Sequence, residues 1–423
     1  MIQSRITIFL AALSMGAAFS NCASTRMSDT QSDSLFRQAK YVEAAERLKA
    51  GLEKKGEDSK DGLLYMLDTG LAYHAAGMYP ESNKYFLRAD QLAEIKDYTS
   101  LATETATLLV SDNIKQYKAE DSENVLINVY LAMNYAFMGK SEDALVEARR
   151  VNRKLYMMVS EGKKKYKQNA FARYLSAILY EANRDWDDAY IDYKAAAEIR
   201  PEFETIGQDL WRMANRLNRT DDRARIEKKY DLTEEQKKAQ VALASKNRPG
   251  EIIVIYENGI SPKKGSDPNF SSIPKFYPRT NPVSGAKIHV HGLDVPEEFV
   301  AETHILENVE ATAIQNLDEK WAGIVAKKVG GVVAKEVVGN VIANKTDSPL
   351  LGMLVKVALF ASDQADTRSW NLLPKDLQIA RIAVKGGKYT VRPELQGSSA
   401  EIPERTVHVN PGQKVFVNFR YTP

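Results

Sequence analysis

One pattern of small and aromatic residues recurs in the first half of this sequence, and it restricts the fold more than any other feature. In residues 67–89, the small Gly70 lets two antiparallel helices approach each other, and Phe86 fills the groove between them. The same pattern fits residues 128–151 and 177–201. Because one pair cannot bury its apolar face alone, repeated pairs predict a stack of helices with a continuous core.

This spacing is that of the tetratricopeptide repeat (TPR), a helix–turn–helix unit of about 34 residues. The turn positions lie farther apart than that, so we expect helices inserted at 99–117 and 153–168. A partial copy opens the array at Tyr41–Gly51, and residues 203–217 are expected to cap it. An unrelated helical bundle is the alternative, since Ala and aromatic residues at helical spacing also form ordinary cores. The residues expected to pack the repeats are Gly70, Tyr73, Gly77, Tyr79, Phe86, Ala89, Ala132, Tyr135, Gly139, Ala144, Tyr180, Trp186, Ala189 and Tyr193.

The concave surface of a helix-pair stack docks peptides or helices of partner proteins and holds no built-in chemistry. Polar residues of the second repeat are the candidates for such a surface. A solvated helix face is the alternative for each of them. The candidate partner-binding residues are Asn134, Glu147, Arg149, Arg150, Asn152 and Arg153.

The composition changes near residue 245, and SKNRPGE at 245–251 is expected to be a linker. Beyond it, proline, glycine and β-branched residues become frequent, which favours strands and turns. Glu251–Tyr256 is expected to be a buried strand, and Gly285–Gly292 a half-buried strand with its histidines exposed. Residues 296–361 are expected to be helical.

Two hairpins are expected near the end of the chain, each with a glycine-containing turn between two strands. Their strands and turns are Gln378–Val384, Gly386-Gly387 and Tyr389–Arg392, then Thr406–Asn410, Pro411-Gly412 and Val415–Tyr421. We therefore predict a mainly α protein, in which a TPR-like α-solenoid at 35–244 is followed by a smaller α+β domain with antiparallel hairpins at 245–423.

The amino terminus has the layout of a secretory signal at residues 1–21, with a cation, a mostly apolar run and small residues. Phe19-Ser20-Asn21-Cys22 resembles the lipobox of bacterial lipoproteins, which implies that Cys22 is lipidated and begins the mature chain. Asn21 stands where Gly or Ala is usual, and ordinary secretory cleavage just before it is the alternative. Residues 22–34 are small and polar, so we expect a flexible tether.

The sequence offers little for catalysis or cofactor binding. Lys and Arg number 58 and Asp and Glu 56, so the formal charge of +2 does not indicate nucleic acid binding. His289 and His291 would bind a metal only if the following segment brought His304 close, and exposed strand histidines are usually inert. No phosphate loop, nucleophile elbow or dinucleotide glycine pattern is present. We therefore expect no enzyme activity, no metal and no cofactor.

Three parts of the sequence stand out as motifs. They are DQADTRSW at 363–370 with Leu373-Pro374 and Ile379-Ala-Arg381, GEIIVIYENG at 250–259, and NVYLAMNYAFMGKSEDALVEARRVNRKL in the second repeat. Together these segments resemble an uncharacterised family of bacterial TPR-like lipoproteins. The resemblance covers most of the mature chain. It implies a surface or outer-membrane-anchored protein without known catalysis, in some bacteria encoded beside lipoprotein activators of penicillin-binding proteins. That neighbourhood implies a role in envelope or peptidoglycan assembly.

The C-terminal motif of this resemblance contains Asp366, Arg368, Trp370 and Pro374. We expect Trp370 and Pro374 to fasten the helical segment to the sheet, because Trp and Pro in a connector usually pack. Arg368 is expected to pair with Asp363 or Asp366 at this junction. A binding site is the alternative.

Together these features predict an interaction scaffold. It would be lipid-anchored in the bacterial outer membrane, face the periplasm, and bind an envelope protein or peptide but no nucleic acid. The alternative is a membrane-interacting or transport-associated lipoprotein that uses the helical segment 321–361, whose interspersed lysines suit an interfacial helix.

Overall fold

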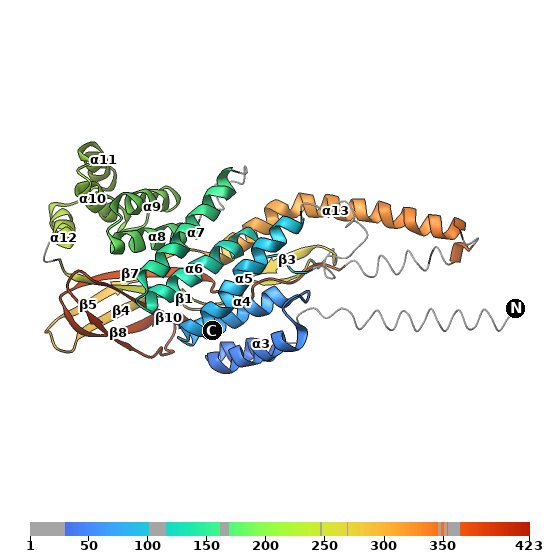
Figure 1. Ribbon diagram of the computed structural model, residues 1–423, viewed down its shortest axis with the longest axis horizontal. Coiled ribbons are helices and arrows are strands. Elements are labelled where there is room, and N and C mark those ends of the chain that lie inside the picture. Colours follow the sequence, from blue (N-terminus) through green and yellow to red (C-terminus); the bar gives the residue numbers. More distant parts are fainter. Residues whose placement is uncertain are drawn as a thin grey trace.

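The computed structural model describes residues 30–100, 116–160, 169–245, 248–268, 270–345, 348–350, 353 and 364–423. The expected signal peptide, Cys22 and most of the tether lie outside the described residues, as does most of the helix expected at 99–117. None of the described helices is long and apolar enough to cross a membrane. A helix stack, two four-stranded sheets, a small two-stranded sheet and one long projecting helix make up the described molecule (Figure 1).

The first half of the chain consists of paired helices. They are α2 (Thr30–Arg37), α3 (Tyr41–Lys55), α4 (Gly62–Ala75), α5 (Tyr79–Ser100), α6 (Asp121–Phe137), α7 (Ser141–Ser160), α8 (Ala170–Asn183), α9 (Trp186–Ile199), α10 (Ile206–Arg216), α11 (Thr220–Tyr230) and α12 (Glu234–Ala244). α4 packs on α5, α6 on α7 and α8 on α9, and these pairs stack side by side (Figure 1). This arrangement confirms the predicted TPR-like solenoid.

The first full repeat shows why the sequence pattern produces helix pairs. Gly70 of α4 faces the ring of Phe86 in α5, and a Cβ at Gly70 would lie 2.9 Å from two ring atoms. Ser82 donates a hydrogen bond to the Gly70 carbonyl at 2.7 Å. Gly77 turns the chain with φ +75°, a left-handed conformation that glycine adopts without strain, and Gly139 does the same in the second repeat with φ +71°.

Most residues expected to pack the repeats are buried between helices. Tyr79, Tyr135 and Trp186 are half-buried, and the turn residues Gly77 and Gly139 are exposed. Small and aromatic side chains therefore fill the space between neighbouring helices, as in the pattern from which the repeats were identified. The buried members are Gly70, Tyr73, Phe86, Ala89, Ala132, Ala144, Tyr180, Ala189 and Tyr193.

Three helical details differ from the sequence expectation. α2 includes Thr30–Ser34, which we assigned to the tether, because Phe36 is fully buried against the repeats and holds this helix in place. Residues 153–160 continue α7 rather than beginning an inserted helix, and 161–168 lie outside the described residues. The cap is longer than 203–217, since α11 and α12 follow α10.

The second half of the chain is built mainly from strands. They are β1 (Gly250–Asn258), β2 (Lys263–Ser266), β3 (Pro274–Tyr277), β4 (Gly285–Gly292), β5 (Glu298–Glu302), β6 (His304–Glu307), β7 (Asp376–Val384), β8 (Gly387–Gln396), β9 (Arg405–Val409) and β10 (Lys414–Tyr421). The first sheet has the order β10-β1-β7-β6 and the second β5-β4-β8-β9. Antiparallel pairs β2–β3, β4–β5 and β8–β9 confirm the predicted α+β class with hairpins.

The first sheet lies between the helix stack and the second sheet. Ile252 and Val254 of β1 pack with Ile288 of the second sheet. The alternating residues Ile253 and Ile255 belong to the core that contains the helices. Because both faces are covered, β1 is buried along its whole length, which explains its nearly uninterrupted apolar sequence. β1 begins at Gly250, inside the stretch that we expected to be a linker.

The two expected C-terminal hairpins are wrong in their pairing, although all four strands exist. The turn after β7 carries the chain from the first sheet to the second, and the turn after β9 carries it back. β8 pairs with β9 instead, and β10 joins β1 in the parallel direction. Local turn residues set the turns, but burial of the first sheet on both faces decides which strands pair.

Residues 298–307 form strands, where we expected a helix that began at residue 296. The reason is a change of sheet at Thr303, between β5 in the second sheet and β6 in the first. The Thr303 hydroxyl accepts a hydrogen bond from Ala286 N–H at 2.9 Å and donates one to Gln378 at 2.5 Å. These bonds connect the two sheets at this corner.

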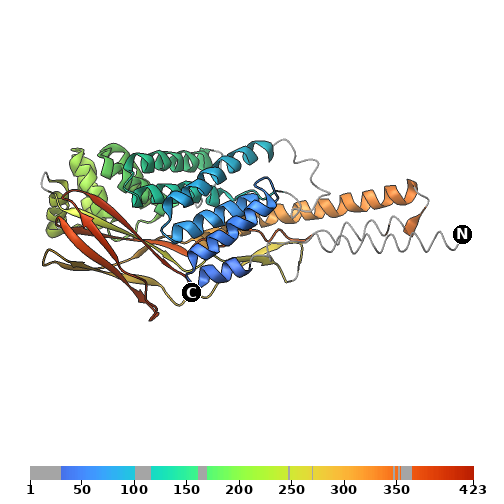
Figure 2. The same ribbon diagram turned by 60° about the horizontal axis from the view of Figure 1, so that its bottom comes forward.

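The expected helix begins later, as α13 (Val309–Lys345), and extends away from the body of the molecule (Figures 1 and 2). Its first turns are attached to the repeats, since Asn316 donates to Ser122 at 3.3 Å and Lys320 pairs with Glu120 beside α6. Trp321, the next residue, is 48% exposed. The helix therefore leaves the body of the molecule after its first three turns.

Candidate interaction surfaces

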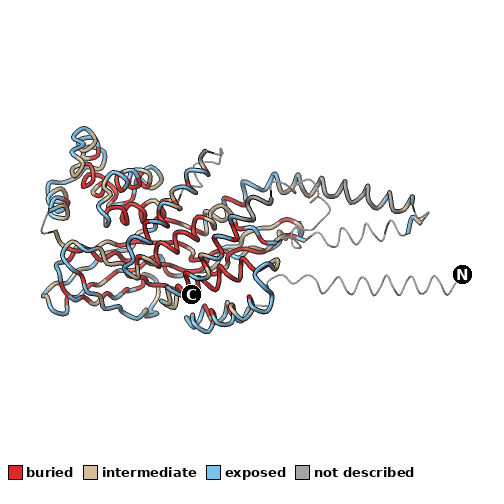
Figure 3. The backbone as a smooth tube through the Cα atoms, in the orientation of Figure 1, coloured by how far each residue is buried: buried red, intermediate tan, exposed pale blue. Residues whose placement is uncertain are grey.

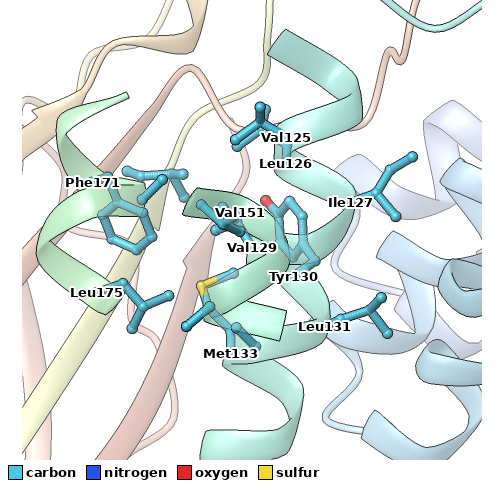
Figure 4. Packing of buried hydrophobic residues seen from close by; sticks show 14 of the residues in the cluster. Val125, Leu126, Ile127, Val129, Tyr130, Leu131, Met133, Val151, Phe171 and Leu175 are labelled. Carbon is cyan, nitrogen blue, oxygen red and sulfur yellow. The ribbon is translucent and has the colours of Figure 1, made fainter. Parts of the chain in front are cut away.

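The inner face of the helix stack is covered by the chain's own first sheet. Buried residues run continuously from the helices into the sheet (Figure 3). Ile253 and Ile379 of the sheet share this core with the repeats. Figure 4 shows part of it, where Val129 and Met133 of α6 lie on the side of Phe171 and Leu175 of α8. The surface that we expected to receive a partner is therefore filled by residues of the same chain.

A buried polar cluster lies at this contact, around Glu257 of β1. His74 of α4 places Nε2 2.8 Å from Glu257 Oε1 and Nδ1 2.5 Å from Asn134 Oδ1. Tyr130 of α6 donates to Glu257 Oε2 at 2.8 Å. Asn418 of β10 donates to Glu257 Oε1 at 3.0 Å. Two repeats and two strands thus meet at one carboxylate.

The charge on Glu257 is stabilised by its neighbours. Burial by itself would raise the pKa of Glu257, but His74, Arg420 and the Tyr130 hydroxyl outweigh burial and lower this pKa to about 2. Glu257 is completely buried, so removal of a partner would leave an uncompensated charge in the interior. The cluster therefore holds the repeats and the sheet in one arrangement.

A second buried cluster joins the third repeat to the sheet. Arg381 of β7 donates to Asp209 at 2.9 Å and to Glu251 at 2.6 Å. Arg212 of α10 donates to the two oxygens of Glu181, both at 2.9 Å. The nearby arginines and Lys414 outweigh burial and hold the pKa of Glu181 well below its usual value. Bidentate arginine–carboxylate contacts of this kind fix orientation as well as charge.

The C-terminal motif lies at the same contact. Trp370 is buried, and the centre of its ring lies 5.8 Å from the ring centres of Phe86 and Tyr130. Pro374 is buried as well. Trp370 thus packs on the repeat helices α5 and α6, and it also borders the first turns of α13.

Arg368 of this motif lies in the segment before β7 and forms hydrogen bonds with the residues at the start of α4. Its guanidinium donates to the two Asp366 oxygens at 2.8 and 2.7 Å. It also donates to the Lys60 carbonyl at 3.0 Å and lies 3.4 Å from Asp61. Asp363, the other expected partner, lies outside the described residues.

Three of the candidate partner-binding residues are occupied within the chain. Asn134 is fully buried in the Glu257 cluster, so its placement on a docking surface is wrong. Glu147 is 3% exposed and accepts a hydrogen bond from Asn128 at 2.7 Å, so it does not lie on an open surface either. Asn152 is half-buried and bonded to Arg173. The physical reason is the same for all three. A polar side chain on a repeat helix can form its hydrogen bonds with a neighbouring helix or with the sheet as readily as with a partner protein.

The remaining candidates lie on the outer helix α7. The side chains of Arg149, Arg150 and Arg153 are 58%, 43% and 63% exposed. In the part of the chain that the structure describes, Arg149 pairs with Asp185 in the turn before α9 at 3.9 Å, and Arg153 pairs with Glu94 of α5 at 3.5 Å. Exposed pairs of this kind contribute little to stability. Val146 and Tyr156 are also exposed on this helix, and we call these five residues the α7 face.

A cavity of about 40 Å³ lies where α6, α13 and the connector before β7 meet. Glu307, Asn316 and Trp370 are among the residues that line it. Burial raises the pKa of Glu307 to about 7, although the hydrogen bond from Thr312 and the charge of Arg200 act in the opposite direction. This volume suits a few water molecules and is far below that of a typical small-molecule site.

Two histidines of β4, in the second sheet, each lie beside a carboxylate. His289 and His291 are 2.7 and 2.9 Å from glutamate oxygens on neighbouring strands. His304 lies instead 3.3 Å from Glu204 in the segment before α10. Within the described part of the chain, no group of three His, Cys, Asp or Glu side chains is arranged to hold a metal ion.

From the sequence we placed Trp370 and Arg368 at a junction, but we missed the buried glutamates that join the two halves of the chain. Two glutamates, Glu251 and Glu257, flank the apolar run of β1, and alternation places them on the same face as Ile253 and Ile255. Charged residues at both ends of a strand that is buried on two sides require buried partners. This was the signal available in the sequence, and the partner His74 lies 183 residues away from Glu257.

No protein-family model and no curated protein matches the chain. Among solved structures, MamA is 14% identical with a TM-score of 0.33, over 50% of this chain and 96% of MamA. The TPR-like repeats of a kinesin light chain from Podosopora anserina are 14% identical with a TM-score of 0.34, over 52% and 96%. A Rap protein complexed with competence and sporulation factor is 15% identical with a TM-score of 0.28, over 50% and 55%. Likeness at this level supports no functional inference, and the TPR-like assignment rests on the helix pairs themselves.

Proposed function

We propose that this protein is a non-catalytic scaffold that binds an envelope protein or peptide through the α7 face. The observation that carries the proposal is the composition and exposure of that face, which presents arginines with an aliphatic and an aromatic side chain. Arginine and tyrosine are enriched among the residues that dominate protein interfaces. The weak ion pairs of Arg149 and Arg153 can exchange for a partner's carboxylates at little cost.

The covered inner face supports this choice of surface. A partner that entered the usual concave groove would have to displace the sheet and expose the buried charges of Glu257 and Arg381. Binding on α7 disturbs neither cluster. The sheet and the repeats share one core, so they hold α7 as a rigid platform.

The location of the scaffold is the second part of the proposal. The lipobox-like sequence before Cys22 and the resemblance to bacterial lipoproteins support a lipid anchor. We propose that this anchor lies in the outer membrane, that the folded part faces the periplasm, and that the scaffold serves peptidoglycan or outer-membrane assembly.

Crosslinking in intact cells tests the scaffold. A photo-reactive amino acid at Tyr156 should capture a defined protein partner. The variant Arg149→Glu/Arg153→Glu should lose that product, because it reverses the charge of the α7 face. The control Arg88→Glu/Arg225→Glu makes the same charge change at arginines that are 51% and 77% exposed on α5 and α11, and it should keep the product. Equal capture by both double variants would contradict the proposed surface.

Acylation tests the anchor. The chain should incorporate a labelled fatty acid and sediment with membranes, and Cys22→Ser should lose both properties. Separation of inner and outer membranes then shows which of the two membranes contains the anchored protein, and we expect the outer membrane. An unlabelled wild-type chain, or a Cys22→Ser chain that is still labelled, would contradict lipidation at this residue.

A second candidate function is contact with a membrane through α13. This helix projects from the body, and the apolar side chains of Trp321, Leu350 and Met353 on it and just after it are 48%, 61% and 64% exposed. Flotation of the non-acylated Cys22→Ser chain with lipid vesicles tests this function. Co-flotation that is reduced by Trp321→Ser supports membrane contact, and a chain that stays at the bottom of the gradient excludes it.

A further inference from the structure

Three arginines gather where the third repeat meets the beginning of β1 and the turn before β10. Arg184 ends α8 in a left-handed conformation, Arg216 ends α10, and Arg248 lies two residues before β1. The Arg216 guanidinium lies 4.2 Å above the ring of Trp186 and donates to the Ala244 carbonyl. We call Arg184, Arg216 and Arg248 the arginine seam.

The buried cluster beneath the seam has no charge left to neutralise these arginines. Its carboxylates are Glu181, Asp209 and Glu251, and its cations are Arg212, Arg381 and Lys414. Each carboxylate is already engaged by at least two of these cations. The interior of the cluster is therefore balanced, and the seam is an excess of positive charge above it.

Two carboxylates that follow Arg184 closely in the sequence are engaged with other residues. Asp185 pairs with Arg149 at 3.9 Å and accepts a hydrogen bond from Asn183 at 2.8 Å. Asp187 pairs with Arg219 at 2.8 Å. Within the described residues, the side chains of Arg184 and Arg248 form no hydrogen bond or ion pair with protein groups, and each guanidinium carries five N–H donors. The seam thus presents unused donors that suit an oxyanion.

The arginines lie close enough to influence one another. Burial lowers the pKa of Arg216, and the charges of Arg248 and Arg184 lower it further. Arg248 also passes close to Gly412 in the turn before β10, where a Cβ would lie 2.7 Å from Arg248 Nε. The glycine leaves room for this side chain beside the third repeat.

The adjoining cavity limits the size of what can enter. It has a volume of about 10 Å³, and Trp186, Arg216, Arg248 and Lys414 are among the residues that line it. That volume holds about one water molecule, so a whole ligand cannot be enclosed. Only the charged end of a larger molecule can reach the arginines, while the rest of that molecule stays outside.

We propose that the arginine seam binds a carboxylate-rich segment of a partner protein. This inference rests on the proposed scaffold function and adds the chemistry of a second contact point. The adjoining cluster favours carboxylate, because Arg212 already holds Glu181 through two parallel hydrogen bonds. An acidic side chain placed between Arg216 and Arg248 continues this alternation of charge outward, and flanking acidic residues reach Arg184.

Binding of a fluorescent hexaglutamate peptide to the full mature chain tests the proposal, with anisotropy as the readout. The variant Arg184→Gln/Arg248→Gln should weaken binding about tenfold, since it removes charge-assisted hydrogen bonds to carboxylate. The fold should not change, because neither side chain has a partner among the described residues. The control Arg88→Gln/Arg225→Gln removes the same charge from other exposed sites and should weaken binding less than about twofold.

Inorganic phosphate and vesicles with anionic lipid serve as the competing ligands. Equal weakening by both double variants would overturn the site, because binding would then follow net charge alone. Binding of phosphate or vesicles without binding of the peptide would overturn the acidic segment as the ligand. If the crosslinked product on the α7 face is absent while seam-dependent peptide binding persists, the scaffold surface fails and the seam stands. The opposite result leaves the scaffold and removes the seam.

Discussion

Replacement of Glu307 with glutamine should make the protein more stable at neutral pH, the reverse of the usual effect of changing a buried residue. Burial raises the pKa of Glu307 from 4.5 to about 7 in the folded protein. The folded protein therefore retains a proton that the unfolded chain releases above a pH of about 4.5. The stability contributed by the protonated carboxyl is complete below that pH and is lost as the pH rises through about 7.

The size of the effect follows from this pKa difference. At about 1.36 kcal/mol per pKa unit, a shift from 4.5 to about 7 corresponds to roughly 3 kcal/mol. Glutamine keeps an acceptor for Thr312, which donates to Glu307 at 2.6 Å, and it cannot ionise. The free energy of unfolding of Glu307→Gln, relative to the original protein, should therefore rise by about this amount from about pH 5 to about pH 8.

Urea unfolding at several pH values, followed by circular dichroism, measures this difference. The comparison between the two proteins isolates Glu307, because burial also raises the pKa of Asp376, to about 6, and both proteins share that residue. Glu302→Gln, at an exposed position on β5, is the control and should change stability by less than about 0.5 kcal/mol at every pH. A difference between Glu307→Gln and the original protein that does not vary with pH would refute the reasoning from burial.

Three further substitutions test the packing and the buried cluster by urea unfolding. Trp370→Ala should cost about 3–5 kcal/mol because it opens a cavity against Phe86, whereas Trp321→Ala at a 48% exposed position should cost less than about 0.5 kcal/mol. Gly70→Ala should cost about 1–3 kcal/mol, since the new Cβ would lie 2.9 Å from the Phe86 ring, and an unchanged midpoint would contradict that contact. Glu257→Gln should cost about 3–5 kcal/mol near neutral pH. Because the pKa of Glu257 is lowered from 4.5 to about 2, the cost should shrink as the pH falls from 4.5 toward 2, and a cost that stays constant in acid argues against a charged Glu257 in the folded protein.

The helical half was predictable because its signals are local. Gly70 and Phe86 are close in sequence and meet across one turn, so their spacing alone indicates the pair. Gly77 marks the turn because its backbone needs a positive φ. The beginning of α2 was missed because Phe36 is held by residues of other helices, which no local pattern records.

The strands were predictable as strands, but their partners were not. The turn at Gly386-Gly387 has the composition of a hairpin, yet it connects two sheets. β10 pairs with β1, and the contact between Lys414 and Glu251 joins residues 163 positions apart. Alternation and turn residues report which faces are apolar, but they carry no information on which distant strand covers them.

For the candidate site, too, the locally determined features were predictable, and those that depend on distant residues were not. The exposed arginines of α7 could be proposed from the sequence, because charge on a helix face is visible there. The burial of Asn134 could not be predicted from the sequence, because its hydrogen-bond partner His74 belongs to another repeat and is itself hydrogen-bonded to Glu257 of the sheet. The sequence does not show whether a polar residue on a repeat helix forms a hydrogen bond within the chain or contacts a partner protein.

The parallel pairing of β1 with β10 joins the first strand after the helices to a segment more than 150 residues later, so this pair forms only when that late segment is available. A chain that emerges amino terminus first, from a ribosome or a translocation channel, presents the complete helix stack while its covering strand is still to come. Until Lys414–Tyr421 arrives, His74 and Glu257 lack Asn418, and the part of the core against which Phe416 packs remains uncovered. Such an intermediate has an unpaired edge on β1 and an incomplete polar cluster around Glu257, and both are completed when β10 pairs with β1.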